Sequence, residues 1–163
     1  MDTQITYTMP PNRIDFDVMM MKICDIIALR SHCLKNKVGS VIVKDGRIIS
    51  MGFNGMLPGM KNCDNIIDCP RREVVSGTRY EIGDCQHAET NAIIFSARYG
   101  IPVKDASLYV NCSICRICAR NIVSAGISIV YFTSAKNMYN GIELLKEVGI
   151  NVIDMKERME ENV

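Results

Sequence analysis

The second half of the chain alternates between two hydrophobic patterns, and this alternation is the strongest constraint on its fold. Short runs rich in β-branched and aromatic residues, typical of strands, are separated by longer stretches with the apolar spacing of helices. The expected helices are 87–100, 115–126 and 137–149, and the expected strands are 106–111, 127–132 and 150–155. Because strands joined by helices form right-handed crossovers, we expect these strands to lie parallel in one sheet.

The first half adds a helix and a hairpin. Residues 15–31 carry a methionine-rich apolar face at helical spacing, and Asp15 is placed to cap the first turn. Two β-rich runs, 38–44 and 47–53, are joined by the Asp-Gly dipeptide at 45–46, a strong hairpin signal. We therefore predict an α/β fold, a three-layer α/β/α sandwich around a mixed sheet of about five strands.

The predicted domain organisation is simple. A chain of 163 residues with 48% apolar content has material for one hydrophobic core, which we place in residues 15–155. A flexible segment, 1–14, precedes this domain and a charged tail, 156–163, follows it. Within the domain, residues 54–86 are irregular and rich in Gly, Pro, Asn and Cys. Such a long loop is unusual, so we expect it to be functional or held by something other than a hydrophobic core.

Cysteine content and charge limit where the protein works and what it binds. The first residues lack an apolar run flanked by basic residues, and no later stretch is long enough to cross a bilayer. We therefore expect a soluble, cytoplasmic protein whose eight cysteines are thiols, metal ligands or catalytic groups. The net charge of +1 lacks the basic excess needed to bind a long nucleic acid. A small substrate is favoured, with no membrane partner.

Cys115 and Cys118 lie at the expected start of a helix, where the helix dipole favours thiolates. By itself a CxxC pair fits a metal site, a redox pair or two core thiols. His87 and Glu89 begin another expected helix, and both helix starts should face the crevice at the carboxyl ends of the strands. Taken alone, a histidine at a helix start is more often a cap or a surface residue. Together, one imidazole and two thiolates would leave a fourth zinc position to water, with Glu89 as general base.

These motifs resemble the deoxycytidylate (dCMP) deaminase family of the zinc-dependent nucleobase deaminases, whose signature is HxE followed by CxxC. The segments RSHCLKNKVGSVIVKDGRIISMGFNG, HAETNAI and CARNIVSAGI, with the Asn-Cys pair at 62–63, are similar to that family in order and spacing. The resemblance covers roughly residues 15–153. It implies a cytidine deaminase-like fold.

The resemblance also implies a cofactor and a reaction. Zinc would be held by His87, Cys115 and Cys118, and Glu89 would pass a proton from water to the pyrimidine ring and then to the departing amine. The reaction would be hydrolytic deamination of dCMP to dUMP with release of ammonia, supplying dUMP for thymidylate synthesis. Relatives are typically oligomeric, so a homo-oligomer, a hexamer or a dimer, is expected.

The family pattern suggests substrate contacts as well. Backbone groups of Ala88 and Ser113 would grip the base edge, and Asn54, at the end of the second strand, would contact the sugar. For the phosphate, the cationic cluster before the first strand offers Arg30 and Lys37. Ser31 and Lys35 belong to the same cluster, and Arg71 and Arg72 are alternatives from the long loop. A charged helix end is more often simply solvated.

Four further cysteines lie in or beside the long loop. Relatives often carry a second, structural zinc in this region, with ligands matching Cys33 and Cys63, which leaves Cys69 and Cys85 to complete the set. A closed four-thiolate site would explain how so long a loop stays ordered. The alternative is that these cysteines are unpaired thiols or partial ligands.

The chain departs from the family pattern in two places. Ile114 stands where the family has proline before the first cysteine, which removes a rigid φ at a cost below about 1 kcal/mol and loses no ligand. The loop usually written GYNGxP appears as GFNGMLPG, so feedback binding of deoxynucleoside triphosphates is not assumed.

Two other functions remain open from the sequence. One is deamination of a different cytosine or adenine substrate: a modified dCMP, CMP, or a base in tRNA or single-stranded DNA. The other is a catalytically impaired regulatory protein that binds zinc or nucleotide. Ile114 is the only feature that favours this last alternative, and retention of Glu89 argues against it.

Overall fold

The computed structural model describes residues 13–65, 69–75, 78–79, 82–133 and 140–161. Its main sheet has five strands in the order β2-β1-β5-β6-β7. These strands are β1 Gly39–Lys44, β2 Arg47–Phe53, β5 Ser107–Val110, β6 Ile129–Phe132 and β7 Asn151–Asp154. β1 pairs antiparallel with both β2 and β5, whereas β5, β6 and β7 are parallel to one another. The predicted mixed sheet is confirmed.

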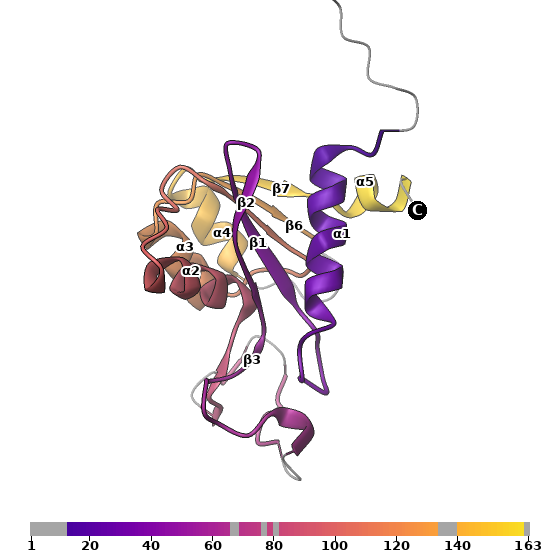
Figure 1. Cartoon of the computed structure of the whole chain (residues 1–163), viewed down its shortest axis with the longest axis vertical. Helices are drawn as coiled ribbons and strands as arrows, with labels where there is room; N and C mark the ends of the chain where they lie inside the picture. The colour runs from indigo at the N-terminus through magenta and orange to yellow at the C-terminus, as the bar shows by residue number, and fades with distance from the viewer. Residues whose placement is uncertain (1–12, 66–68, 76–77, 80–81, 134–139, 162–163) are drawn as a thin grey trace, which may run out of the picture.

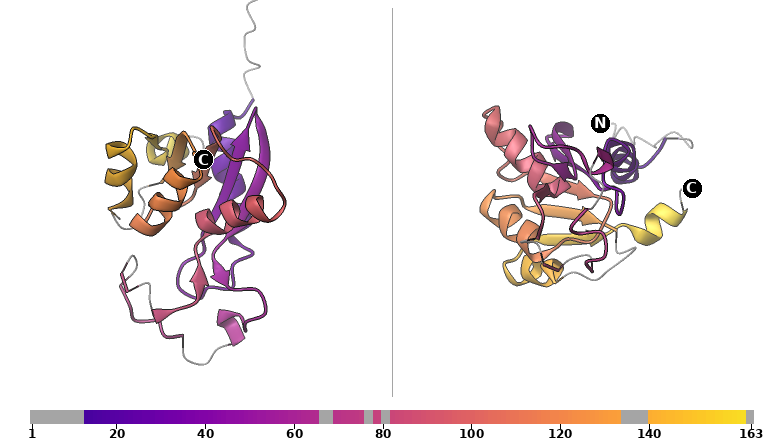
Figure 2. Two further views of the ribbon diagram at one scale, coloured as in Figure 1. Left: turned by 90° about the vertical axis from the view of Figure 1, so that its left-hand side faces the viewer. Right: turned by 90° about the horizontal axis from the view of Figure 1, so that it is seen from below.

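Helices cover both faces of this sheet and give the predicted three layers (Figures 1 and 2). One face carries α2 Ala88–Arg98, α3 Arg116–Ser124 and α4 Gly141–Glu147. The other carries α1 Phe16–Ala28, with the short helix α5 Lys156–Glu161 beside it. The expected helix 137–149 is described only from residue 140, and the expected flexible segment 1–14 lies outside the described residues except for its last two.

The two faces of the sheet build two separate cores, because neighbouring strand residues point to opposite sides. Ile42, Leu108 and Val110 face the layer of α2, α3 and α4. Val41 and Tyr109, their neighbours along the strands, pack instead against α1. The sheet is therefore buried on both sides, which fixes its register and the position of every helix start at its edge.

The start of α1 also holds the C-terminal helix. Asp15 caps α1 as predicted, since its carboxylate accepts hydrogen bonds from the N–H groups of Asp17 and Val18 at 3.0 and 3.1 Å. Arg158 of α5 forms ion pairs with Asp15 at 2.7 Å and Asp17 at 3.3 Å. Residues 156–161, predicted only as part of a charged tail, thus form a helix anchored to α1; residues 162–163 lie outside the described chain.

The described residues of the segment 54–86 form a lobe below the sandwich in Figure 1. They include the 3-10 turn η1 Cys63–Asn65 and a two-stranded sheet of β3 Gly55–Met56 and β4 Cys85–Gln86. Among the described residues of the lobe only Cys63 is buried. In its described part the lobe therefore has no hydrophobic core of its own.

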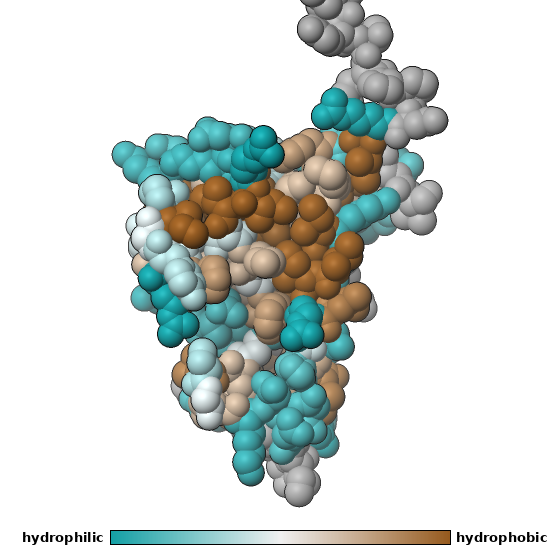
Figure 3. Space-filling model, in the orientation of Figure 1, coloured by the Kyte–Doolittle hydropathy of each residue, from teal (hydrophilic) through white to brown (hydrophobic). Residues whose placement is uncertain are grey.

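None of the helices in the described ranges is long and apolar enough to cross a membrane. Apolar side chains nevertheless gather on the surface, over β2 and α1 in the view of Figure 3. On these two elements Met51 is 58% exposed and Ile26 65% exposed, and Ile48 and Phe16 are also exposed.

Candidate active site

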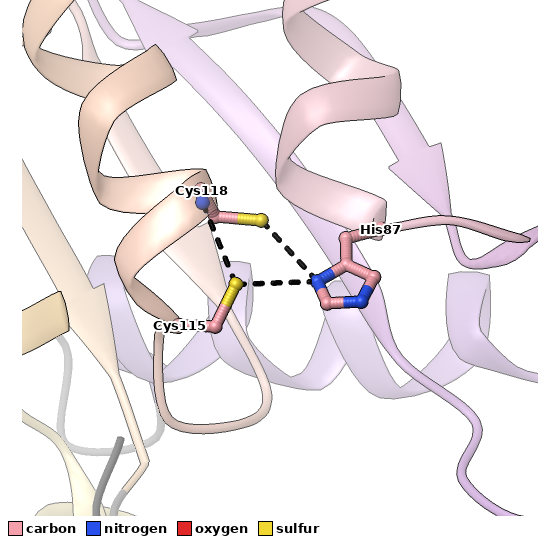
Figure 4. Close-up of side chains that lie close together, drawn as sticks. All are labelled: His87, Cys115 and Cys118. Atoms are coloured by element: carbon pink, nitrogen blue, oxygen red, sulfur yellow. Dashed lines mark hydrogen bonds between the residues drawn. The ribbon is translucent and has the colours of Figure 1, made fainter. Parts of the chain in front are cut away.

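The ligand atoms of His87, Cys115 and Cys118 meet where α2 and α3 begin (Figure 4). His87 Nδ1 lies 3.5 Å from Cys115 Sγ and 3.4 Å from Cys118 Sγ. All three ligand atoms lie within 4.8 Å of one another. In the described part of the chain, no other three His, Cys, Asp or Glu residues come together this closely. The predicted meeting of two distant motifs is therefore observed.

This arrangement fits a zinc ion. With Zn–S bonds of about 2.3 Å and Zn–N bonds of about 2.0 Å, tetrahedral coordination places a sulfur and a nitrogen ligand about 3.5 Å apart. The two observed N–S separations, 3.5 and 3.4 Å, match that spacing. Three protein ligands also leave one tetrahedral position for water or substrate, which is the pattern of catalytic zinc sites.

The starts of two helices position the ligands. His87 and Cys115 are the N-cap residues of α2 and α3, with extended backbone at ψ 152° and 160°. The His87 side chain makes no capping hydrogen bond, and its Nδ1 faces the two sulfurs instead. Cys115 Sγ accepts a hydrogen bond from the Cys118 N–H at 3.4 Å. Exposed N–H groups at such helix starts favour thiolates.

Two glycines bring the backbone close to these helix starts. A Cβ at Gly52 of β2 would lie 2.4 Å from the Ala88 carbonyl oxygen, next to His87. A Cβ at Gly141, the first residue of α4, would lie 2.4 Å from the carbonyl oxygen of Ile114 and 2.6 Å from that of Cys115. No side chain fits at either place. The ligand positions are thus fixed by close backbone packing, and Ile114 is itself fully buried.

The charges within the ligand set support one another. The hydrogen bond with Cys118, and a further one with His87, lower the pKa of Cys115 to about 3. The hydrogen bond with Cys115 in turn raises the pKa of His87, although burial opposes this shift. Cys118 is the exception, because the hydrogen bond with Cys115 and burial raise its pKa. Even without a metal, the site therefore stabilises one thiolate, at Cys115, the form that binds zinc.

Glu89 lies beside the ligands but is not one of them. Its side chain is 2% exposed, and it lines the same cavity as His87 and Cys115. Burial raises the pKa of the Glu89 carboxyl, while the nearby His87 lowers it. A carboxyl group with a raised pKa, held in a cavity next to a metal site, is suited to accept and return a proton.

The cavity above the ligands has a volume of about 130 Å³. Ala88, Ser113 and Asn54, the predicted base and sugar contacts, all line it. Asn54 also braces the loop before β1: its Oδ1 accepts from the Val38 N–H and its Nδ2 donates to the Asn36 carbonyl, both at 2.8 Å. Its contact with a sugar stays a prediction.

The predicted phosphate contacts are divided between two hollows. Arg30 and Lys37 line a separate hollow together with His32 and Asp64, which among the described residues adjoins the cavity only at Cys33. Arg30 lies there because it belongs to the exposed turn that closes α1, where its N–H bonds the Ile27 carbonyl at 3.0 Å. The cationic residues that line the cavity, in the described part of the chain, are Lys35 and Arg71.

The cysteines of the lobe gather at the same cavity. Cys33, Cys63, Cys69 and Cys85 all line it. Burial and the neighbouring thiols raise the pKa of Cys85 to about 12. Burial and the nearby Cys33 raise the pKa of Cys63, whereas a hydrogen bond with Cys85 opposes this shift. All four are free thiols, and they do not reach the close spacing of the His87 group.

Two residues beside the ligands were not predicted from the sequence. Thr90 Oγ1 lies 3.4 Å from Cys118 Sγ, and Asn121 Nδ2 donates a hydrogen bond to Thr90 Oγ1 at 3.0 Å. The only signal in the sequence is spacing: Thr90 follows His87 by three positions and Asn121 follows Cys118 by three, so each shares a helical face with a ligand.

Comparison with known proteins agrees with this geometry. Residues 15–134 match the family described as "Cytidine and deoxycytidylate deaminase zinc-binding region". The deoxycytidylate deaminase of Enterobacteria phage T2 is 32% identical over 177 residues, covering 88% of this chain and 94% of the relative. That of Saccharomyces cerevisiae is 35% identical over 144 residues, covering 88% of this chain but 46% of the yeast protein. The structure of dCMP deaminase from the cyanophage S-TIM5 in complex with dCMP and dUMP superposes with a TM-score of 0.71 at 26% identity, covering 91% of this chain and 100% of the other.

Proposed function

Because the chain belongs to the cytidine and deoxycytidylate deaminase family, we propose that it is a zinc-dependent enzyme that hydrolyses dCMP to dUMP and ammonia. The observation that carries this proposal is the three-ligand site with a buried, unligated carboxylate beside it. The substrate follows from the relatives, which are named deoxycytidylate deaminases, and from the cyanophage enzyme, whose structure holds dCMP and dUMP. The product would supply thymidylate synthesis.

In this proposal His87, Cys115 and Cys118 hold the zinc, which when bound supplies Lewis-acid activation of a water molecule. Glu89 takes a proton from water and gives it to the ring nitrogen of the base, which makes the amine-bearing carbon electrophilic. The hydroxide that remains from the water adds to that carbon and forms a C–O bond, and Glu89 then carries the proton of the new hydroxyl group to the amine. The C–N bond breaks, ammonia leaves, and the carbon keeps its oxygen as the carbonyl of dUMP. Ala88 and Ser113 present backbone groups to the base edge from the cavity wall.

We place the phosphate of the nucleotide near Lys35 and Arg71. Both line the cavity, whereas Arg30 and Lys37 line the separate hollow. Arg71 also donates to the Thr78 carbonyl at 3.0 Å, which orients its guanidinium within the lobe. Lys35 Nζ likewise donates to a carbonyl of the lobe, that of Val74. A planar guanidinium and an ammonium group that line one cavity are a suitable pair for a phosphate monoester.

The test is ammonia release from dCMP, CMP, deoxycytidine and a cytosine-containing oligonucleotide by the zinc-loaded protein. We expect dCMP to be the best substrate; deamination of the oligonucleotide alone would contradict the proposal. Arg71→Gln should raise KM for dCMP about tenfold or more while leaving KM for deoxycytidine, which has no phosphate, nearly unchanged. Arg30→Gln is the matched control and should change neither.

A second, structural zinc in the lobe is a further part of the proposal. Four free cysteines line one side of the cavity while the described part of the lobe lacks a hydrophobic core, so a metal would supply the missing stabilisation. Elemental analysis should give two zinc ions per chain, and Cys63→Ser should reduce this to one without removing the zinc at His87. One zinc per wild-type chain would overturn it.

The exposed surface and the cysteine content bear on the assembly and the location of the protein. The exposed apolar surface over β2 and α1 supports a homo-oligomer, a dimer or hexamer, which light scattering would test. The eight cysteines, all free, support a cytoplasmic location, since such a compartment keeps thiols reduced.

A further inference from the structure

We infer that Thr90 and Asn121 act as a pair of positioning residues that hold the sulfur of Cys118 in place and draw off part of its negative charge. Thr90 Oγ1 lies 3.4 Å from Cys118 Sγ, and Asn121 Nδ2 donates to Thr90 Oγ1 at 3.0 Å. The inference rests on the zinc site of the proposed function. It adds two residues, one from each of the helices that carry the ligands.

The direction of this hydrogen-bond chain is determined by its chemistry. A thiolate that binds a metal has no proton, so it can only accept a hydrogen bond. The Thr90 hydroxyl has one proton, and its oxygen already accepts from the Asn121 amide. The proton is therefore available for Cys118 Sγ, and the amide on α3 sets the rotation of the hydroxyl on α2.

Thr90 differs in this respect from Ser96, the other residue of α2 with a side-chain hydroxyl. Ser96 donates to the Ala92 carbonyl of its own helix at 3.0 Å, as serine and threonine commonly do inside helices. Thr90 lies in the first turn and directs its hydroxyl across to the neighbouring helix instead. A role confined to the stability of α2 does not account for that direction.

The surroundings of Cys118 explain why it needs such support. His87 lines both the substrate cavity and a second hollow of about 320 Å³, Cys115 lines only the first, and Cys118 lines only the second. Thr90 and Asn121 line the second hollow as well. They thus hold Cys118 on the side where the substrate makes no contact with it.

The hydrogen bond also matters for charge. Two thiolates carry as much negative charge as a divalent cation carries positive charge, which weakens the cation as a Lewis acid. A donor that draws charge from one sulfur restores part of this strength, and such outer hydrogen bonds commonly change metal affinity by about 10–100-fold. The pair therefore offsets the electrostatic disadvantage of a site with two cysteines.

The experiment compares Thr90→Val, which keeps the shape but removes the hydroxyl, with Thr90→Ser, which keeps the hydroxyl. Zinc affinity is measured by competition with a chelator, and the cobalt(II)-substituted proteins are examined by absorption spectroscopy. We expect Thr90→Val to weaken zinc binding about tenfold or more and to move the thiolate-to-cobalt charge-transfer band to longer wavelength. Thr90→Ser should remain close to wild type in both measurements.

Two further variants complete the test. Asn121→Leu should weaken zinc binding and move the charge-transfer band to longer wavelength, as Thr90→Val does, but by smaller amounts. If Thr90→Val does not fold, Asn121→Leu serves as the test variant in its place. Ser96→Ala, which removes a hydroxyl from the same helix, should lower the melting temperature without changing affinity or spectrum. Wild-type affinity and spectrum in Thr90→Val, or in Asn121→Leu if only that variant folds, would overturn the inference. The wild-type dCMP assay tests the proposed function separately, because affinity and spectrum are measured without substrate.

Discussion

The metal site and the neighbouring lobe face the same cavity, but they are built in opposite ways. His87 and Cys115 begin helices that pack on a sheet buried on both faces, and glycines bring the backbone against those helix starts. The lobe, residues 54–86, contributes Arg71 and several thiols to the same cavity, yet among its described residues only Cys63 is buried. The side chains proposed to hold the metal are thus fixed by packing, and Arg71, proposed to bind the phosphate, is held by polar contacts of the lobe.

The largest effect is expected from Glu89→Gln. Loss of the proton carrier should lower kcat for dCMP by about 10²–10⁴-fold, and zinc should remain bound because Glu89 is not a ligand. Removing a carboxylate that burial disfavours should also raise the melting temperature by about 2–4 °C, for about 1 kcal/mol. Ammonia release, elemental analysis and thermal unfolding measure the three quantities. Normal turnover would show that another residue carries the proton.

A pair of glycine substitutions would sharpen the comparison between the two regions. Gly141→Ala should destabilise the protein by about 2 kcal/mol and weaken zinc binding, because its Cβ would press on the backbone of Ile114 and Cys115. Gly55→Ala, in the lobe, should change stability by less than about 0.5 kcal/mol, since nothing lies within 4 Å of its Cβ. Denaturant unfolding compares the two. Equal effects would mean that backbone packing does not fix the ligands.

Zinc removal should separate the regions directly. After treatment with a chelator, we expect amide hydrogen exchange in the lobe to become about tenfold faster or more, because the lobe depends on the proposed second zinc. Exchange in β1, β5 and β6 should change little, since these strands lie between two hydrophobic cores. The measurement is hydrogen exchange followed by mass spectrometry. Uniform acceleration across the chain would contradict the contrast between lobe and sandwich.

The smallest effect is expected at the far end of the molecule. Arg158→Ala removes the ion pairs of α5 with Asp15 and Asp17, which are partly exposed to solvent. Stability should fall by about 1 kcal/mol or less, and zinc binding and dCMP turnover should stay unchanged. A large loss of activity would show that α5 influences the site through α1.

Local patterns made most of the fold and the metal ligands predictable. The alternation of strand and helix patterns predicted the parallel half of the sheet. The HxE motif places His87 and Glu89 in one helical turn, and the CxxC motif does the same for the two cysteine ligands. Helix α5 was missed because its six residues are mostly charged and show no apolar spacing typical of a helix. Arg158, which anchors it, pairs with Asp15, 143 positions away in the sequence. α1 ended at Ala28, earlier than the expected residue 31, because Leu29 caps it and a turn follows.

The residues around the ligands were harder to predict because they depend on the path of the loops. Arg30 and Lys35 are close in sequence, yet only Lys35 lines the cavity. Arg71 reaches it from the middle of the lobe. Asn54 occupies the predicted place, but its amide is engaged by the backbone of residues 36 and 38. Spacing in the sequence could not show which of these side chains reach the cavity and which are engaged elsewhere.

The second hollow has a practical consequence for inhibition. A nucleotide that fills the main cavity would close the approach to Cys115, whereas Cys118 and one side of His87 would still face the other opening. A mercurial or another soft, thiol-seeking reagent would then inactivate the enzyme by reaching Cys118 through the second hollow. Saturating amounts of substrate would give little protection.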